Sequence, residues 1–351
     1  MIPTDTRLRN APSAVPAEGH DVVVIGASAG GVQALSEVMD GLPPNLPAAV
    51  FVVLHVAPHG HSALPAILSR LGCLPASHPV DGEEIQPGRV YVAPPDRHLE
   101  IEGSHVQLSR KASENGHRPA VDVLFRTAAR SFGPRVVGVV LTGNLDDGTA
   151  GLAAIKRCGG KAVVQDPREA DYPSMPESAI ANVAVDHVLP LGDVAAMIRR
   201  LVYEPPAPAD YRQEEPDPMS ERDDEDGSLT GDPSGLTCPA CGGALFEKPG
   251  ESPVHFRCRT GHAYSPESLA ASQTETLDAA LWAALRSLEE TAALARRMEK
   301  RARGRDHPAA GQRYQQRARD ADQHAALLRT MLQQGALELD EAKEAKEAKR
   351  G

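Results

Sequence analysis

Short apolar runs alternate with helical patterns along the first 200 residues of the chain. Runs rich in valine and isoleucine predict buried strands, because β-branched side chains are stiff and pack well on a pleated surface. Apolar residues spaced by three and four positions predict amphipathic helices between these runs. Strands are expected at residues 22–25, 48–54, 136–141 and 162–164, with helices starting near residues 31, 64, 119 and 149. The alternation predicts an α/β fold: a doubly wound, mainly parallel sheet with helices on both faces.

The segment between the second and third strands is less regular. Residues 89–93 and 105–108 are expected to be short strands, and the turn-like Pro94-Pro95-Asp96 between them suggests that they pair as a hairpin. Pro119 is expected to open the next helix, because proline suits a first helical turn.

The pattern changes after residue 202. Residues 203–235 hold six prolines and eleven acidic residues, a composition that predicts an extended linker without a core. Helical spacing returns later and is interrupted at residues 304–308, which predicts a helical hairpin or coiled coil. We therefore expect a disordered leader (1–20), an α/β domain (21–202), the linker (203–235), a cysteine-containing module (236–265), the hairpin (266–335) and a charged tail (336–351).

Four residues of ligand type cluster in the module after the linker. Cys238-Pro239-Ala240-Cys241 is followed, after sixteen residues, by Cys258-Arg259-Thr260-Gly261-His262. A C-x2-C pair followed by C-x3-H fits the four ligands of a tetrahedral structural zinc site. Zinc would stabilise a module too small to build much of a core, so we expect a zinc-ribbon-like fold. The remaining cysteines, Cys73 and Cys158, lie in apolar helical contexts and are expected to be core thiols.

Ser28 lies on the tight turn between the first strand and its helix. Gly26-Ala27-Ser28-Ala29-Gly30 has the G-x-S-x-G spacing, in which small residues let the chain turn sharply around an exposed nucleophile. Two other interpretations fit the same turn. It could bind a phosphate at the helix N-terminus, or Ser28 could cap the helix.

Reactive side chains follow three of the predicted strands. The first strand ends at Ser28, the second at His55, and the third at a loop with Asp146 and Asp147. Parallel sheets bind ligands at the carboxyl ends of their strands, and a serine nucleophile needs a histidine base and a carboxylate to orient that base. The sequence pattern does not choose among His55, His59 and His61, or between the two aspartates. Either aspartate could instead cap the helix that follows.

Charge and composition narrow the function classes. The formal net charge of −11 disfavours binding to nucleic acid or to an anionic membrane surface. No apolar run is long enough to span a bilayer, and the first 20 residues lack the apolar core of a secretory signal, so membrane insertion and secretion are not expected. Five cysteines, an odd number, favour a reducing cytoplasm with a metal site over a disulfide framework.

Six stretches of the α/β region form an ordered set of motifs that covers a little over half of the chain. They are Ile25-Gly26-Ala27-Ser28-Ala29-Gly30-Gly31; His55-Val56-Ala57-Pro58; Val90-Tyr91-Val92-Ala93-Pro94-Pro95-Asp96-Arg97-His98; His117-Arg118-Pro119-Ala120-Val121-Asp122-Val123-Leu124-Phe125; Gly138-Val139-Val140-Leu141-Thr142-Gly143 with Asp147-Gly148; and Met175-Pro176-Glu177-Ser178-Ala179-Ile180. With these motifs, residues 21–200 resemble the catalytic domain of the chemotaxis protein-glutamate methylesterases (CheB-type).

The resemblance implies roles for individual residues. Ser28 would be the nucleophile, His55 the base and Asp147 the orienting carboxylate, and no cofactor would be needed for catalysis. Members of the family are serine hydrolases that cleave glutamyl methyl esters on the cytoplasmic helices of chemoreceptors, and some also deamidate glutamine. The implied partner is therefore a methylated chemoreceptor-like protein. An acyl-enzyme would form on Ser28, with backbone N–H groups after Ser28 and after Gly143 as oxyanion donors.

The chain departs from the family pattern in two places. Asn144-Leu145-Asp146 stands where the family often has Met-Gly-Asn, and Asp146 adds a like charge beside Asp147 that would raise the pKa of one of the two carboxyls. Well-known members also carry an N-terminal phospho-receiver domain, whereas about 20 residues precede the α/β domain here. The resemblance therefore implies a stand-alone form without control by aspartyl phosphorylation in cis.

Two functions of other classes remain as alternatives. A Rossmann-like nucleotide-binding protein is disfavoured, because Ser28 takes the second glycine position of G-x-G-x-x-G and His55 ends the second strand. A catalytically silent signalling scaffold would instead use the cysteine module and the helices as its working surface. The helices after residue 265 could self-associate, dock on the catalytic domain or bind a receptor bundle, and the sequence does not choose among these three interactions.

Overall fold

The computed structural model describes residues 19–57, 62–206, 231–247 and 254–348. The chain divides into two compact units, residues 1–269 and 270–351. The predicted leader lies outside the described residues except at its end, where His20 is buried and its Nδ1 lies 2.9 Å from the carbonyl oxygen of Leu201. Residues 207–230, most of the predicted linker, also lie outside the described part.

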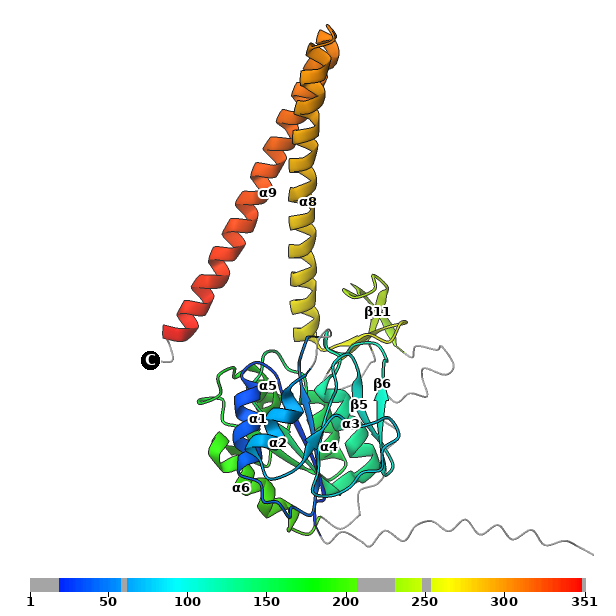
Figure 1. Cartoon of the computed structure of the whole chain (residues 1–351), viewed down its shortest axis with the longest axis vertical. Coiled ribbons are helices and arrows are strands. Elements are labelled where there is room, and N and C mark those ends of the chain that lie inside the picture. The colour runs from blue at the N-terminus through cyan, green and yellow to red at the C-terminus, as the bar shows by residue number, and fades with distance from the viewer. Residues whose placement is uncertain (1–18, 58–61, 207–230, 248–253, 349–351) are drawn as a thin grey trace, which may run out of the picture. The chain divides into compact units, whose positions relative to one another are not determined.

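A seven-stranded parallel sheet forms the centre of the first unit (Figure 1). Valine-rich strands bury both of their faces, as expected for a sheet covered on both sides. The order of strands across the sheet is β3 (Ala76–Ser77), β4 (Val90–Val92), β2 (Ala49–Leu54), β1 (Val22–Ala27), β7 (Val136–Val140), β8 (Lys161–Gln165) and β9 (His187–Leu189). Every neighbouring pair is parallel, which confirms the predicted sheet.

Helices cover both faces of this sheet, because alternate side chains of each strand point to opposite sides. Val23 and Ile25 of β1 belong to one hydrophobic cluster, and Val22 and Val24 belong to the other. On the first face lie α1 (Gly31–Asp40), α2 (Leu64–Leu71) and α6 (Leu191–Val202). On the second lie α3 (Val121–Phe132), which a short 3-10 helix (Gly133–Arg135) follows, α4 (Thr149–Arg157) and α5 (Ser174–Asn182).

The predicted pairing of residues 89–93 with residues 105–108 is wrong. Residues Val90–Val92 are fully buried and lie in the main sheet as β4. The hairpin instead joins β5 (His98–Glu102) to β6 (His105–Ser109), in register from His98 with Ser109 to Glu102 with His105. An entirely apolar short strand is best buried between two parallel neighbours, whereas the half-exposed β6 suits a two-stranded hairpin.

The helix expected from Pro119 begins two residues later, at Val121. Its first two N–H groups, those of Val121 and Asp122, donate to the carboxylate of Asp147. These are donors that an α-helix leaves without an intrahelical partner, so the helix starts where a carboxylate takes them up.

The cysteine-containing module folds as a four-stranded antiparallel sheet (Figure 1). Its strands are β10 (Asp232–Thr237), β11 (Ala244–Glu247), β12 (Phe256–Cys258) and β13 (Ala263–Tyr264). Its buried cluster is small and consists of Cys238, Leu245, Cys258, Tyr264 and Leu269.

The second unit is built from two long helices, α8 (Pro266–Arg303) and α9 (Pro308–Ala348), which confirms the predicted helices and the break between them. Alanines at helical spacing are buried on both helices, among them Ala292 and Ala321, because small side chains let two helices approach closely. The Arg296–Asp322 ion pair connects the helices across the hairpin. In the part of the chain that the structure describes, no helix is both long and apolar enough to cross a membrane.

Candidate active site and cysteine cluster

Ser28 follows β1 directly, at the carboxyl end of a central strand of the sheet. Gly30, next in the turn, has φ 73°, the left-handed conformation that glycine adopts without a steric cost. The loop after β7 approaches the serine so closely that a Cβ on Gly143 would lie 2.8 Å from the Cβ of Ser28. Two turns from neighbouring strands therefore meet at the serine.

His55 connects Ser28 to Asp147. Its Nδ1 lies 3.0 Å from Ser28 Oγ, and its Nε2 lies 2.7 Å from Asp147 Oδ2. The side chains of His55 and Asp147 are only 6% and 2% exposed. The structure thus brings together the three residues predicted at the ends of β1, β2 and after β7, which are adjacent strands.

Asp147 accepts four hydrogen bonds. Oδ2 accepts from His55 and from the N–H of Val121, and Oδ1 accepts from the N–H of Asp122 and from Asn115 Nδ2. Burial alone would raise the pKa of Asp147, but the hydrogen bond and charge of His55 outweigh it, and the pKa lies below its ordinary range. The carboxylate is therefore ionised and rigidly held.

The tautomer of His55 follows from this arrangement. An ionised carboxylate can only accept, so His55 Nε2 must carry the proton. Nδ1 then presents a lone pair to the hydroxyl of Ser28 and can take its proton. The site can therefore convert a serine hydroxyl into a nucleophile.

A second histidine, His117, stacks on His55 with ring centroids 3.6 Å apart and the planes 12° from parallel. Burial and the nearby His55 lower the pKa of His117 to about 4, so His117 is neutral near pH 7. The stack confines the imidazole of His55 to one plane. In the sequence, His117 belongs to one of the family motifs, but nothing marks it for a role in the site, because stacking between two loops leaves no spacing pattern.

Asn115 and Asp122, two polar residues that donate to Asp147, were not predicted as site residues from the sequence. Asn115 has φ 52° and donates from its side chain to both Asp122 and Asp147. Burial raises the pKa of Asp122 well above its ordinary value, and the neighbouring carboxylates of Asp147 and Glu114 add to the rise. The sequence carried one signal for Asp122, an acidic residue in the first turn of a helix, and none for Asn115.

Asn144, Leu145 and Asp146, the residues that depart from the family pattern, lie on the loop before Asp147. Leu145 has φ 61°, so it occupies the left-handed region that glycine adopts more easily. Asp146 is buried and accepts hydrogen bonds from the hydroxyls of Ser265 and Ser268, both at 2.8 Å. The pKa of Asp146 is raised, as the paired aspartates predict. The largest cause is burial, with the charges of Glu267 and Asp147 as smaller contributions.

The expected oxyanion donors are backbone N–H groups after Ser28 and after Gly143, and the N–H groups at these two turns differ in whether they have an acceptor. The N–H of Ser28 donates to the carbonyl of Thr142, and the N–H of Gly143 donates to the carbonyl of Tyr172. Among the described residues, the next N–H groups along the chain, those of Ala29 and Asn144, donate to no protein acceptor. These two groups remain for an oxyanion beside Ser28.

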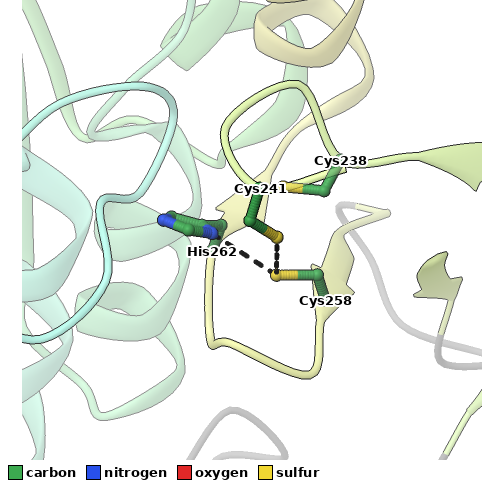
Figure 2. Close-up of side chains that lie close together, drawn as sticks. All are labelled: Cys238, Cys241, Cys258 and His262. Atoms are coloured by element: carbon green, nitrogen blue, oxygen red, sulfur yellow. Dashed lines mark hydrogen bonds between the residues drawn. The ribbon is translucent and has the colours of Figure 1, made fainter. Parts of the chain in front are cut away.

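The four predicted ligands lie together in the cysteine module, as Figure 2 shows. The Sγ atoms of Cys238, Cys241 and Cys258 and a ring nitrogen of His262 all lie within 4.8 Å of one another. The Sγ atoms of Cys241 and Cys258 are 3.6 Å apart, and Cys258 Sγ lies 3.5 Å from His262 Nδ1. Such spacings suit the corners of a tetrahedron around one ion, so this cluster can hold a metal.

The electrostatics of one thiol also favour metal binding. A hydrogen bond from Thr260, with the N–H of Gly243 in support, lowers the pKa of Cys241 to about 6. The thiolate is the form that binds metals.

The expectation that Cys73 is a core thiol is wrong: α2 ends at Leu71 and Cys73 is exposed, while Cys158 is half-buried at the end of α4. The alternative histidines His59 and His61 lie outside the described residues.

Comparison with known proteins identifies relatives of the α/β domain. The family model for CheB methylesterase matches residues 23–198. A relative from Leptospira interrogans, whose name includes the activities of a protein-glutamate methylesterase and a protein-glutamine glutaminase, is 39% identical over 183 residues, 52% of this chain and 95% of the relative. The protein-glutamate methylesterase/protein-glutamine glutaminase 2 of Pseudomonas aeruginosa is 40% identical over 181 residues, 50% of this chain and 52% of that protein.

A solved structure is similar as well. The crystal structure of the Thermotoga maritima CheB methylesterase catalytic domain has a TM-score of 0.50 and 34% sequence identity, and the match covers 52% of this chain and 98% of that one. The match to this domain supports the α/β architecture described above.

Proposed function

The chain belongs to the CheB methylesterase family, and on that premise we propose that it hydrolyses methyl esters of glutamyl residues in a chemoreceptor-like protein, with deamidation of glutamine as a second activity. The observation that carries the proposal is the continuous hydrogen-bonded path from Ser28 through His55 to Asp147. The relatives named for these activities support it.

The mechanism follows from the site's geometry. Ser28 Oγ attacks the ester carbonyl carbon while His55 Nδ1 takes the hydroxyl proton, and Asp147 stabilises the imidazolium that forms. The N–H groups of Ala29 and Asn144 would stabilise the oxyanion. His55 then gives the proton to the departing methoxide, which leaves as methanol. Water, activated by the same histidine, cleaves the acyl-enzyme and releases glutamate.

The experiment compares the wild-type chain with Ser28→Ala on receptor membranes carrying labelled methyl esters. We expect methanol release by the wild type and loss of at least about 10³-fold in the variant. Equal release from both proteins would reject the function and favour a signalling scaffold. Phosphonylation of Ser28 by a fluorophosphonate probe, in which Oγ bonds to phosphorus and fluoride leaves, would give an independent test on the same proteins.

The α/β domain is proposed to carry this activity within residues 21–202, with a linker at 203–235 and a zinc-binding module at 236–265. Zinc is proposed at Cys238, Cys241, Cys258 and His262, because three thiolates and one imidazole are typical zinc ligands at the observed spacing. Metal analysis of the purified chain should find about one zinc ion per molecule. A stoichiometry near zero without chelators would reject the zinc site.

We further propose a cytoplasmic location and self-association through the C-terminal helices. The cytoplasm is where the substrate helices of chemoreceptors lie and where thiols stay reduced. Large apolar side chains exposed on α8 and α9 support self-association; they include Leu277, Trp282, Leu294, Leu327 and Met331. Sedimentation of the wild type against Trp282→Ser would test it, with a monomeric wild type as the contrary result.

A further inference from the structure

The end of the cysteine module reaches the hydrogen-bond network of Asp147. The N–H of Asn115 donates to the carbonyl of Ala263 at 2.8 Å, and the N–H of Ser265 donates to Asn115 Oδ1 at 3.0 Å. Both sides of this contact belong to the first compact unit. The backbone of segment 263–265 therefore binds both the backbone and the side chain of Asn115.

The contact from Ser265 decides which way the amide of Asn115 points. A backbone N–H can only donate, so it must face the amide oxygen. The amide nitrogen then faces the carboxylates, 3.0 Å from Asp122 Oδ2 and 3.1 Å from Asp147 Oδ1. With the amide reversed, its oxygen would meet two carboxylates and its NH₂ would meet the N–H of Ser265. The module thus holds Asn115 as a donor to the carboxylate that orients His55.

A second contact holds the neighbouring residue of the same loop. Asp146 accepts from the hydroxyls of Ser265 and Ser268, and the N–H of Ser268 donates to Ser265 Oγ at 3.0 Å. Ser265 lies immediately before α8 and caps its first turn, where a negative charge is favourable. All three side chains are buried. The module therefore fixes the loop of Asp146 and Asp147 from a position about 120 residues away in the sequence.

The same segment is continuous with the metal cluster. His262, one of the four ligands, directly precedes Ala263, and the N–H of Cys258, another ligand, donates to the carbonyl of His262 at 3.0 Å. Strands β12 and β13, which flank this loop, pair through Arg257 with Ala263. Tyr264 packs in the small cluster formed with Cys238 and Cys258. Because so little apolar surface supports this loop, a bound metal would supply much of its order.

We propose that metal binding to the cysteine cluster controls the rate at which Ser28 reacts. Asn115 is the positioning residue that connects the cluster to Asp147. In the loaded module, segment 263–265 keeps Asn115 directed at Asp147, and Asp147 keeps His55 aligned with Ser28. Without metal, segment 263–265 is released and His55 loses its alignment. The inference rests on the proposed hydrolase function of Ser28.

The test uses the full chain and a fluorophosphonate probe that labels Ser28. The amplitude of labelling counts intact sites, and the rate of labelling measures the reactivity of each site. Chelation of the wild type should slow labelling about tenfold to hundredfold at unchanged amplitude, the equivalent of one hydrogen bond to a charged group. Added zinc should restore the rate. A purely structural role would lower the amplitude and leave the rate per site unchanged.

Three variants sharpen the test. Cys241→Ser should label at the chelated rate and not respond to zinc, whereas Cys73→Ser, an exposed thiol outside the cluster, should behave as the wild type. Asn115→Gly keeps the left-handed backbone and removes the amide. It should label slowly with or without zinc, because the metal and Asn115 act through one path.

Three results would reject the control by metal, the path through Asn115 or the hydrolase function. A wild type whose labelling rate ignores chelation overturns the control by metal, and this arm does not depend on the folding of any variant. Equal slowing of the wild type and Asn115→Gly on chelation overturns the path through Asn115. A zinc-loaded wild type that neither labels at Ser28 nor releases methanol rejects the hydrolase function instead, and the inference with it.

Discussion

Replacing Asp147 by asparagine should disable the base while leaving the domain folded. The carboxylate accepts from four donors, two on each oxygen. Asparagine has one oxygen, so its amide must face either pair. If the oxygen faces His55 and Val121, the new NH₂ meets two donors, Asn115 Nδ2 and the N–H of Asp122. If the oxygen faces Asn115 and Asp122, only the N–H of Val121 loses its acceptor, because His55 can change its tautomer and accept.

The second orientation is therefore the more stable one. It leaves one buried N–H without a partner, which costs about 1 to 3 kcal/mol of unfolding free energy. Its consequence for catalysis is severe. His55 Nε2 now accepts from the amide, so Nδ1 carries the proton and cannot take one from Ser28. A wrong histidine tautomer of this kind costs about 10⁴-fold in kcat.

Two measurements check the prediction. Urea unfolding should show Asp147→Asn destabilised by about 1 to 3 kcal/mol, and methanol release should show kcat lowered about 10⁴-fold at similar KM. The matched control is Asp186→Asn, whose carboxylate accepts from Lys156 and from the N–H of Ala162. Ala162 lies at the start of β8, at the opposite edge of the parallel sheet from Ser28. Asp186→Asn should lose comparable stability and keep kcat. A loss of kcat below about tenfold in folded Asp147→Asn would refute the assigned tautomer.

Three further predictions concern the residues around the triad. The pKa of His117 falls from 6.5 in the unfolded chain to about 4 in the folded one. The contribution of neutral His117 to the free energy of unfolding is therefore fully present above pH 6.5 and is lost as the pH falls toward 4. His117→Phe should remove up to about 3 kcal/mol of this loss, as measured by urea unfolding at several pH values. A Cβ on Gly26 would lie 2.3 Å from Val121 Cγ1, so Gly26→Ala should cost about 1 to 3 kcal/mol and lower kcat, and adding Val121→Ala should recover part of the stability. Leu145→Gly should change the free energy of unfolding by no more than about 1 kcal/mol. Leu145→Val should lower the free energy of unfolding, because a β-branched residue is strained at positive φ.

The part of the site that the sequence made predictable lies at the strand ends. A buried parallel strand must be apolar along its length, so the first polar residue after it marks the sheet's carboxyl edge. Ser28 and His55 follow this rule, and Asp147 lies on the loop after the third strand. The family motifs chose His55 and Asp147 among their neighbours. The cysteine spacing identified its cluster for a similar reason, since four ligands of one ion must lie close together in short segments.

Contacts between distant segments could not be read in this way. The pairing of β6 with β5 rather than with β4 depends on which strand the main sheet takes in, and the spacing of apolar residues does not encode that choice. Asn115 and His117 lie on a loop whose backbone conformation places one side chain under Asp147 and the other on His55. No repeat or motif spacing marks such positions.

The chain's own order of residues determined the α/β sheet, the serine turn, the strand ends that carry the candidate base and carboxylate, and the four clustered ligands, because each depends on local periodicity or short spacing. Only the tertiary structure decided that Ser265 and Ser268 bind Asp146 and that Asn115 connects the cysteine module to Asp147. The contacts of Ser265 and Ser268 join residues more than 100 positions apart, and a hydrogen bond between such residues forms only when the whole unit has folded.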